Sequence, residues 1–231
     1  MIERVSDKNL DKNLSPKNTL PVLYSLQNCP YAMRARLTLL LSEQDIIIRA
    51  ITLKDKPQTM LKASPKGTVP VLVLTDGTVI EESMEIMLWA LEQSDPNNLL
   101  PQDKPDIQQA IIKLIQRGDD EFKHPLEQYR AAKRYHRDSE IHWREQCESF
   151  IEELEQRLST NSYFVGNSAS LADYSFIPFM RQFGRVDRKW FANAPYPNVK
   201  AWLSTQLQSR LYAKMMTKHP LWHEEAADTF L

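Results

Sequence analysis

A segment rich in proline and asparagine near the middle of the chain separates two stretches with different periodicity. Residues 96–105 (PNNLLPQDKP) hold three prolines and two asparagines, which interrupt any regular element, and we interpret them as a linker. Before this linker, residues 20–95 alternate between strand-like and helix-like patterns. After it, residues 106–231 follow the helix period, with no convincing strand among them. The sequence therefore predicts a mixed α/β domain followed by an all-helical domain.

The first domain is expected to alternate strands and helices. The continuous β-branched run at 45–52 is typical of a strand buried on both faces. Asp76-Gly77 between two apolar runs indicates a hairpin turn. The expected segments are, in order, a strand at 21–25, a helix from 30, a strand at 45–52, a short helix within 54–66, a hairpin of 69–74 and 78–80, and a helix at 83–93.

The rest of the chain shows either helical periodicity or none. Residues 1–19 are rich in Lys, Asp, Asn and Ser, and their lack of an apolar period predicts a mobile extension. The segments of the second domain with the helix period are 106–137, 141–158, 171–183 and 199–210.

Composition excludes several classes of function. With 29 Lys and Arg against 30 Asp and Glu, the chain lacks the excess positive charge that nucleic-acid binding needs. Its apolar runs are too short for a transmembrane helix, and its polar N-terminus lacks the apolar core of a secretory signal. The five glycines are too scattered for a dinucleotide-binding or phosphate-binding loop. We expect a cytoplasmic protein that does not bind nucleic acid or membranes.

Cys29 lies where the first strand should end and the first helix begin. Pro30 suits the first helical position, because its missing N–H would have no partner there. The sulfur would then lie beside the free N–H groups of the helix, which favour the thiolate, and Arg34 and Arg36 add positive charge. The alternative is a small buried apolar residue. We favour a reactive thiol for Cys29. Cys147, between acidic neighbours inside a helical segment, is expected to pack in the core or to be half-buried.

The dipeptides Glu82-Ser83 and Val69-Pro70 each allow two interpretations. Ser83 begins a predicted helix, so its hydroxyl either caps that helix or joins the helix N-terminus in binding a ligand carboxylate. On spacing alone we favour the cap. Since only about 5–6% of X-Pro bonds in folded proteins are cis, the residues by themselves predict a trans bond before Pro70.

The five histidines do not predict a metal site. His136 and His142 are six residues apart, which places them on different faces of a helix, and Pro220 separates His219 from His223.

Short motifs spread over the first domain resemble those of one superfamily. They are Cys29-Pro30-Tyr31-Ala32, Lys54-Asp55-Lys56-Pro57, Val69-Pro70 and Glu82-Ser83. In this order and spacing they resemble the glutathione transferase superfamily, most closely its cysteine-containing, omega-like members, over residues 20 to about 210. In the second half, residues 170–173 (SLAD) look like that family's helix-capping box, and residues 122–130 resemble a bacterial omega-like subgroup.

The resemblance implies a thioredoxin-like N-terminal domain, an all-helical C-terminal domain, a homodimer, and glutathione as cosubstrate. The site residues that it implies are Cys29 facing the glutathione sulfur, Val69 offering its backbone to the cysteinyl part ahead of a cis-Pro70, Glu82 and Ser83 on the γ-glutamyl end, and Lys56 on the glycyl carboxylate.

Ala32 stands where a dithiol glutaredoxin has its second cysteine. Cys29 alone would form a mixed disulfide that free glutathione must resolve, which predicts a monothiol exchange with a small disulfide. One alternative is conjugation of glutathione to an electrophile, with Ser25, Tyr24 or Tyr31 activating the glutathione thiol. Another is a glutathione-fold module without enzymatic activity that binds other proteins.

The pocket for the second substrate is expected between the two domains, where ligand clefts are common. His124, Tyr129 and Tyr174 are candidates to line it, because their helices should flank the cleft.

Overall fold

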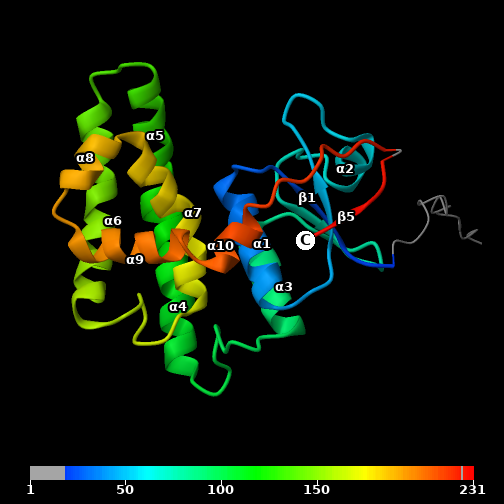
Figure 1. Ribbon diagram of the computed structural model, residues 1–231, viewed down its shortest axis with the longest axis horizontal. Helices are drawn as coiled ribbons and strands as arrows, with labels where there is room; N and C mark the ends of the chain where they lie inside the picture. Colours follow the sequence, from blue (N-terminus) through cyan, green and yellow to red (C-terminus); the bar gives the residue numbers. More distant parts are fainter. Residues whose placement is uncertain (1–18, 225) are drawn as a thin grey trace, which may run out of the picture.

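The computed structural model describes residues 19–224 and 226–231, and they form two domains that lie side by side (Figure 1). The expected extension, residues 1–19, lies outside the described part of the chain apart from Thr19. The first domain contains, in order, β1 (Val22–Ser25), α1 (Pro30–Leu41), β2 (Ile47–Ala50), α2 (Gln58–Ala63), β3 (Val71–Val73), β4 (Val79–Ile80) and α3 (Ser83–Gln93). The expected thioredoxin-like order of strands and helices is confirmed.

Strand β1 lies at the centre of the sheet, with all four of its residues buried. It pairs in parallel with β2 and antiparallel with β3, which in turn pairs antiparallel with β4. Because successive side chains point to opposite faces, Leu23 packs against α1 and α3, whereas Tyr24 packs near Met60 of α2. The sheet is therefore covered on both faces, and the carboxyl end of β1 leads directly to the start of α1.

The linker leads into a helical domain whose first long helix is interrupted. The sequence predicts one helix over 106–137, whereas the structure has α4 (Pro105–Arg117), a π-helical turn η1 (Gly118–Phe122) and α5 (Lys123–Arg134). Gly118 is the first residue of the turn, and a Cβ atom there would lie 2.2 Å from Cε1 of Phe176 in α7 (Leu171–Val186). The missing side chain lets α7 approach closely at the point where the helix widens.

Five further helices complete the described part of the second domain, and one of them, α7, runs through its core (Figure 1). They are α6 (Glu140–Thr160), α7 (Leu171–Val186), α8 (Arg188–Asn193), α9 (Pro197–Leu207) and α10 (Arg210–Met215). The expected capping box at the start of α7 is confirmed. The Asp173 carboxylate accepts hydrogen bonds from Ser170 N and Oγ, both at 2.9 Å, and from Phe164 N at 3.1 Å.

The end of the described chain returns to the first domain, which the sequence did not predict. Strand β5 (Thr229–Phe230) pairs antiparallel with β2, so in the described residues the sheet has five strands in the order β4-β3-β1-β2-β5. Trp222 N donates to Ala50 O at 2.8 Å, and its ring lies 4.0 Å from the Arg49 guanidinium. The expectation that residues 106–231 are entirely helical is wrong here, because a two-residue strand has no periodicity to detect and is defined by its partner.

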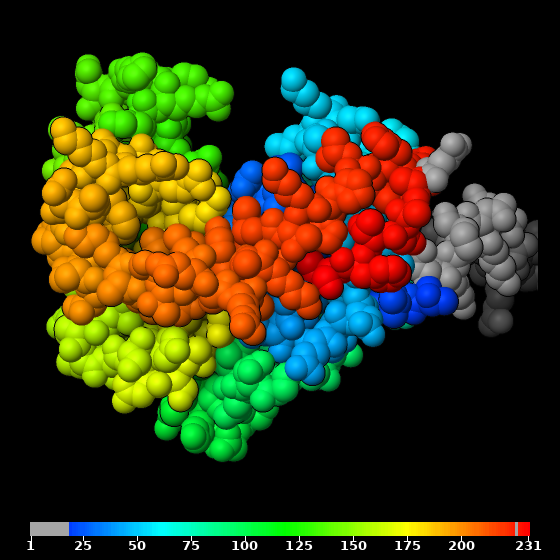
Figure 2. Space-filling view, viewed as in Figure 1, coloured from blue at the N-terminus to red at the C-terminus, as the bar shows by residue number. Residues whose placement is uncertain are grey.

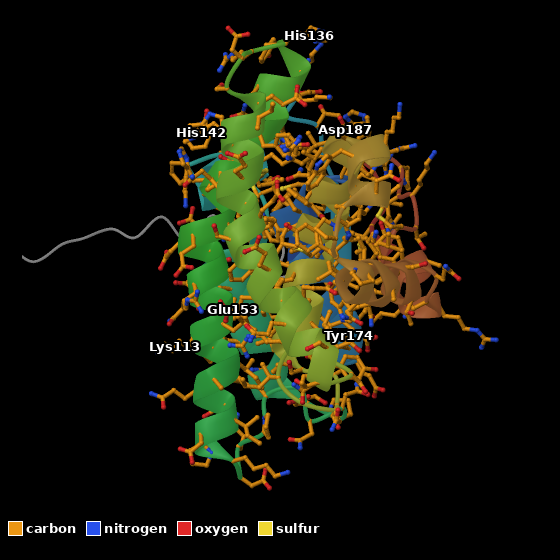
Figure 3. All side chains as sticks on the ribbon, turned by 90° about the vertical axis from the view of Figure 1, so that its left-hand side faces the viewer. Lys113, His136, His142, Glu153, Tyr174 and Asp187 are labelled. Atoms are coloured by element: carbon orange, nitrogen blue, oxygen red, sulfur yellow. The ribbon has the colours of Figure 1, made fainter. Side chains whose placement is uncertain are left out.

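None of the described helices is long and apolar enough to cross a membrane. Among the described residues there is also no group of three or more His, Cys, Asp or Glu side chains that could hold a metal ion. His136 lies in the turn between α5 and α6, at the top of the view in Figure 3.

Candidate functional site

Cys29 is the N-cap residue of α1, immediately before Pro30 in the first turn. Its backbone is extended and its side chain is half-buried, so the sulfur lies at the end of the helix where N–H groups are free. The Sγ atom lies 3.9 Å from the carbonyl oxygen of Val69. The structure thus brings two of the expected site residues together from segments 40 positions apart.

The peptide bond between Val69 and Pro70 is cis. The trans bond expected from general frequencies is therefore wrong, and the cis bond implied by the resemblance is correct. The general frequency failed because it averages over all proline contexts and contains no information about the loop that faces Cys29.

Arg36 holds the loop that carries Cys29. Its buried guanidinium donates to the carbonyl oxygens of Leu26 at 3.3 Å and Gln27 at 2.8 Å, and to the Ser25 hydroxyl. Burial lowers the pKa of Arg36 to about 10, with Cys29 and Tyr212 acting in the opposite direction. The side chain stays charged at neutral pH, so it contributes positive charge next to this loop.

Ser83 is the first residue of α3 rather than its cap, since Glu82 is the N-cap residue and neither side chain caps the helix. The favoured interpretation of Ser83 as a cap is therefore wrong. Its buried Oγ instead accepts a hydrogen bond from Arg34 Nε at 2.9 Å. A hydroxyl that accepts one bond keeps its own hydrogen, so Ser83 is still able to donate to a ligand.

The other expected binding residues lie on the surface near the same loops. The Glu82 side chain is 58% exposed and forms an ion pair with Lys66. Lys56, between β2 and α2, is half-buried, and its Nζ would lie 3.3 Å from a Cβ atom at Gly67. Lys56 therefore packs against the turn that leads to Val69.

A cleft of about 400 Å³ opens beside Cys29, between the two domains. Figure 2 shows the surface hollowed between the green helix α5 and the cyan loop before α2, where the cleft opens. Cys29 lines it, but Lys56, Val69, Glu82 and Ser83 do not. Its other walls include Leu26, Tyr31, Leu53, Leu126, Phe179 and Gln182.

Two family models match the chain, one on each domain. The model described as "Glutathione S-transferase, N-terminal domain" matches residues 23–98, and that described as "Glutathione S-transferase, C-terminal domain" matches residues 110–204. The chain belongs to the glutathione transferase superfamily. Membership makes it a glutathione transferase enzyme with glutathione as cosubstrate, as the resemblance implied.

Relatives with named functions match most of the chain. Mouse glutathione S-transferase omega-1 is 26% identical over 208 residues, which are 88% of this chain and 85% of the relative. A probable maleylacetoacetate isomerase of Caenorhabditis elegans is 30% identical over 193 residues, 79% of this chain and 86% of the relative. The match to the mouse protein supports the omega-like resemblance read from the motifs.

Solved structures show the same fold. A glutathione transferase family member from Pseudomonas fluorescens Pf-5, solved with two glutathione molecules bound, aligns with a TM-score of 0.76 at 16% identity, covering 85% of this chain and 92% of that one. Glutathione S-transferase-I bound with lactoylglutathione aligns with a TM-score of 0.72 at 21% identity, covering 86% and 99%.

The three hydroxyl groups considered for conjugation differ in whether they line the cleft beside Cys29. Ser25 is buried and accepts from Arg36, while the Tyr24 hydroxyl donates to Thr59 Oγ1 at 3.1 Å and accepts from Arg49 at 3.0 Å. Only Tyr31 lines the cleft. Burial, as the main cause, raises the pKa of Tyr31 to about 12, so its phenol is protonated at neutral pH.

The residues expected to line the second-substrate pocket do not do so. Tyr129 is 1% exposed in the helical core, and His124 packs edge-on against Trp143, with ring centroids 5.7 Å apart. Tyr174 lies at the opposite end of α7 from Asp187 (Figure 3), whereas the cleft uses Phe179 and Gln182 farther along this helix. The sequence analysis thus identified the two helices that line the cleft, α5 and α7, but named residues on the wrong turns or faces of these helices.

The sequence analysis did not identify the cluster of ion pairs that joins the two domains next to the site. Arg34 of α1 and Lys123 of α5 both form ion pairs with Asp119 of η1. The Lys123 ammonium lies 4.8 Å from the centre of the Tyr31 ring, in the wall of the cleft. The sequence feature that could have indicated this cluster is the pair Asp119-Asp120, next to a glycine inside a helical pattern.

Proposed function

We propose that this transferase is a monothiol thiol transferase, in which Cys29 exchanges the glutathionyl group of a small disulfide. The observation that carries the proposal is the position of the Cys29 sulfur, half-buried at the N-terminus of α1 and opening into the cleft between the domains. Ala32, in the first turn of α1, occupies the position that a second thiol would have. Cys147, the other cysteine of the sequence, is fully buried in the helical domain.

The reaction then has two thiol–disulfide exchanges. In the first, the Cys29 thiolate attacks the glutathione sulfur of a substrate R–S–SG, forming a Cys29–SG disulfide and releasing the thiolate R–S⁻. In the second, the thiolate of free glutathione attacks the glutathione sulfur of the Cys29–SG disulfide, which yields oxidised glutathione and regenerates the Cys29 thiolate. Overall, R–S–SG and one glutathione become R–SH and oxidised glutathione, with no other oxidant or reductant.

Glutathione is held in this proposal by the residues around Cys29. The Val69 backbone pairs with the cysteinyl part, next to the Cys29 sulfur, and Lys56 binds the glycyl carboxylate. Ser83 donates its free hydrogen to the α-carboxylate of the γ-glutamyl end at the start of α3, where the helix dipole favours negative charge. Glu82, exposed beside it, binds the ammonium group of the same end.

Conjugation of glutathione to an electrophile is the second candidate, and Tyr31 is the observation that favours it. Its protonated phenol lines the cleft with Cys29, and its hydrogen, which is directed at Glu127 Oε1 at 3.5 Å, would turn to the thiolate of glutathione in this reaction.

Replacing Cys29 by Ser separates the two reactions. The wild type and Cys29→Ser should be assayed for reduction of a glutathionyl mixed disulfide and for conjugation to a chlorinated aromatic electrophile. Thiol exchange predicts that disulfide reduction falls to background in Cys29→Ser, because oxygen cannot form the mixed disulfide, while conjugation is kept or raised. The control Cys147→Ala should keep disulfide reduction, since Cys147 is buried.

Disulfide reduction that persists in Cys29→Ser would overturn the thiol mechanism and favour Tyr31. Wild-type protein that binds immobilised glutathione but is inactive in both assays would favour a binding module.

The proposal includes a homodimer in a reducing cytoplasm. Light scattering should give a mass near twice 26.9 kDa, and cell fractionation should recover the protein with cytoplasmic markers.

A further inference from the structure

A second depression of about 440 Å³ lies next to the Cys29 cleft, between α5 and α7. It shares Asn28, Arg130 and Gln182 with that cleft, so the two form one continuous groove that begins at Cys29. Five basic side chains line the second depression: Arg130, Lys133 and Arg134 from α5, and Arg181 and Arg185 from α7. We call this second depression the basic groove.

The basic groove contains no carboxylate among its lining residues. Lys133 is neutralised by Glu140 and by Asp187, labelled in Figure 3, each at 2.8 Å. The four arginines form no ion pair within the part of the chain that the structure describes. Three arginines elsewhere in the helical domain are paired: Arg117, Arg144 and Arg157 each bond a glutamate at 2.8–2.9 Å. The basic groove is thus a local excess of positive charge in a chain of net charge −1.

Arg181 is held in an unfavourable setting for a cation. Its side chain is half-buried, and this burial lowers its pKa. Arg185, one helical turn away on the same face, lowers it further, whereas Tyr212 opposes the shift. A bound anion would relieve both the burial and the repulsion, because guanidinium groups pair with carboxylate and phosphate oxygens in two-pronged geometry.

We propose that the second substrate of this transferase is a small molecule with at least two negative charges, whose anionic end binds the basic groove while its sulfur meets Cys29. The inference rests on the proposed function for the identity of the reacting atoms. The volume of the groove falls within the roughly 300–1,000 Å³ usual for small-ligand sites. The apolar walls of Leu26, Leu53 and Phe179 would contact the part of the molecule between sulfur and anion.

Two unreactive thioethers test the inference without catalysis. S-(4,4-dicarboxybutyl)glutathione places two carboxylates at the end of an alkyl chain beyond the sulfur, and S-butylglutathione carries the same chain without them. Calorimetry at low ionic strength should show that the wild type binds the dicarboxylate about tenfold more tightly. Arg181→Gln/Arg185→Gln should remove that preference and leave the affinity for the neutral thioether unchanged.

Two further variants keep the test independent of folding. Arg185→Gln changes only an exposed side chain and should lose part of the preference, whereas Arg181→Lys retains the charge and should retain most of it. Arg210→Gln, also exposed but outside the groove, is the matched control and should behave as the wild type.

Equal affinity of the wild type for the two thioethers, or an equal loss of both in the arginine variants, would overturn the anionic substrate while leaving glutathione binding intact. Failure of the wild type to bind either thioether would overturn the proposed glutathione site itself.

Discussion

Arg34 and Asp119 form a two-pronged ion pair across the two domains. Nη1 of Arg34 donates to Oδ1 of Asp119 and Nη2 donates to Oδ2, each at 3.0 Å. Nε of the same guanidinium donates to Ser83 Oγ at 2.9 Å, and Nη1 also donates to Ser175 Oγ at 3.3 Å. One buried side chain therefore connects the helix that begins after Cys29 with α3, η1 and α7.

Replacing Asp119 by Asn should destabilise the protein strongly. The Arg34 side chain is only 2% exposed, so the change leaves a buried cation without its anion, at a cost of about 3 kcal/mol in the free energy of unfolding. Urea denaturation measures this cost. Glu121→Gln in the same π-helical turn is the control, because its pair with Arg117 is exposed and should contribute less than about 1 kcal/mol. Equal losses in the two variants would contradict the importance of burial.

Only Cys29 should react with thiol reagents in the folded protein. Cys147 is fully buried, and burial raises the pKa of its thiol, so it stays protonated as well as shielded. Intact-mass measurement after iodoacetamide, or after oxidised glutathione, should show one adduct at pH 7 and still one at pH 9. A second adduct should appear only in denaturant, and Cys29→Ala should show none in the folded state. An adduct mapped to Cys147 in native protein would refute this prediction.

Ser83→Ala should weaken glutathione binding about ten- to a hundredfold, since a hydrogen bond to a charged group contributes roughly 1.5–3 kcal/mol. The variant also removes an acceptor from Arg34, so the control is Ser175→Ala, which removes the other serine that accepts from the same guanidinium. Calorimetry should show a large loss for Ser83→Ala and little change for Ser175→Ala. A similar loss in both would mean that Arg34, rather than direct contact, causes the effect.

Gly118→Ala should destabilise the helical domain by about 1–3 kcal/mol through overpacking. The added methyl group would lie 2.2 Å from Cε1 of Phe176 and 3.0 Å from Cζ of Phe150. Shortening the opposing side chain should restore part of the loss, so thermal unfolding of Gly118→Ala, Phe176→Leu and the double variant forms a cycle. Losses that simply add would show that the two side chains do not collide.

The fold of the first domain was predictable because strong local signals agree with the tertiary structure. Pro30 opens α1 as expected, and the β-branched residues 45–52 include strand β2, whose first two residues are buried. The π-helical turn was not predictable in the same way. Its first residue, Gly118, leaves room for Phe176, which lies 58 positions farther along, and helical periodicity alone shows one unbroken helix there.

The candidate site was predictable only in part, for a similar reason. Cys29 was identified from its own neighbours, since a helix start and Pro30 are local features. The bond from Arg34 to Ser83 joins residues 49 positions apart, so the sequence suggested a helix cap instead. The basic groove was also missed: Arg130, Arg134, Arg181 and Arg185 come from two helices, and α5 by itself looks like an ordinary charged helix end.

Strand β5 also affects the order in which the protein folds. Thr229 bonds to Ile48 across 181 positions of sequence, and the whole helical domain lies between them. During synthesis, the outer edge of β2 therefore stays unpaired until long after the other strands of its sheet have been made. An unpaired strand edge is a template for pairing with other chains. The nascent first domain is thus most prone to aggregation in the interval between the synthesis of β2 and that of β5, while the helical domain, built from local contacts, is free to fold first.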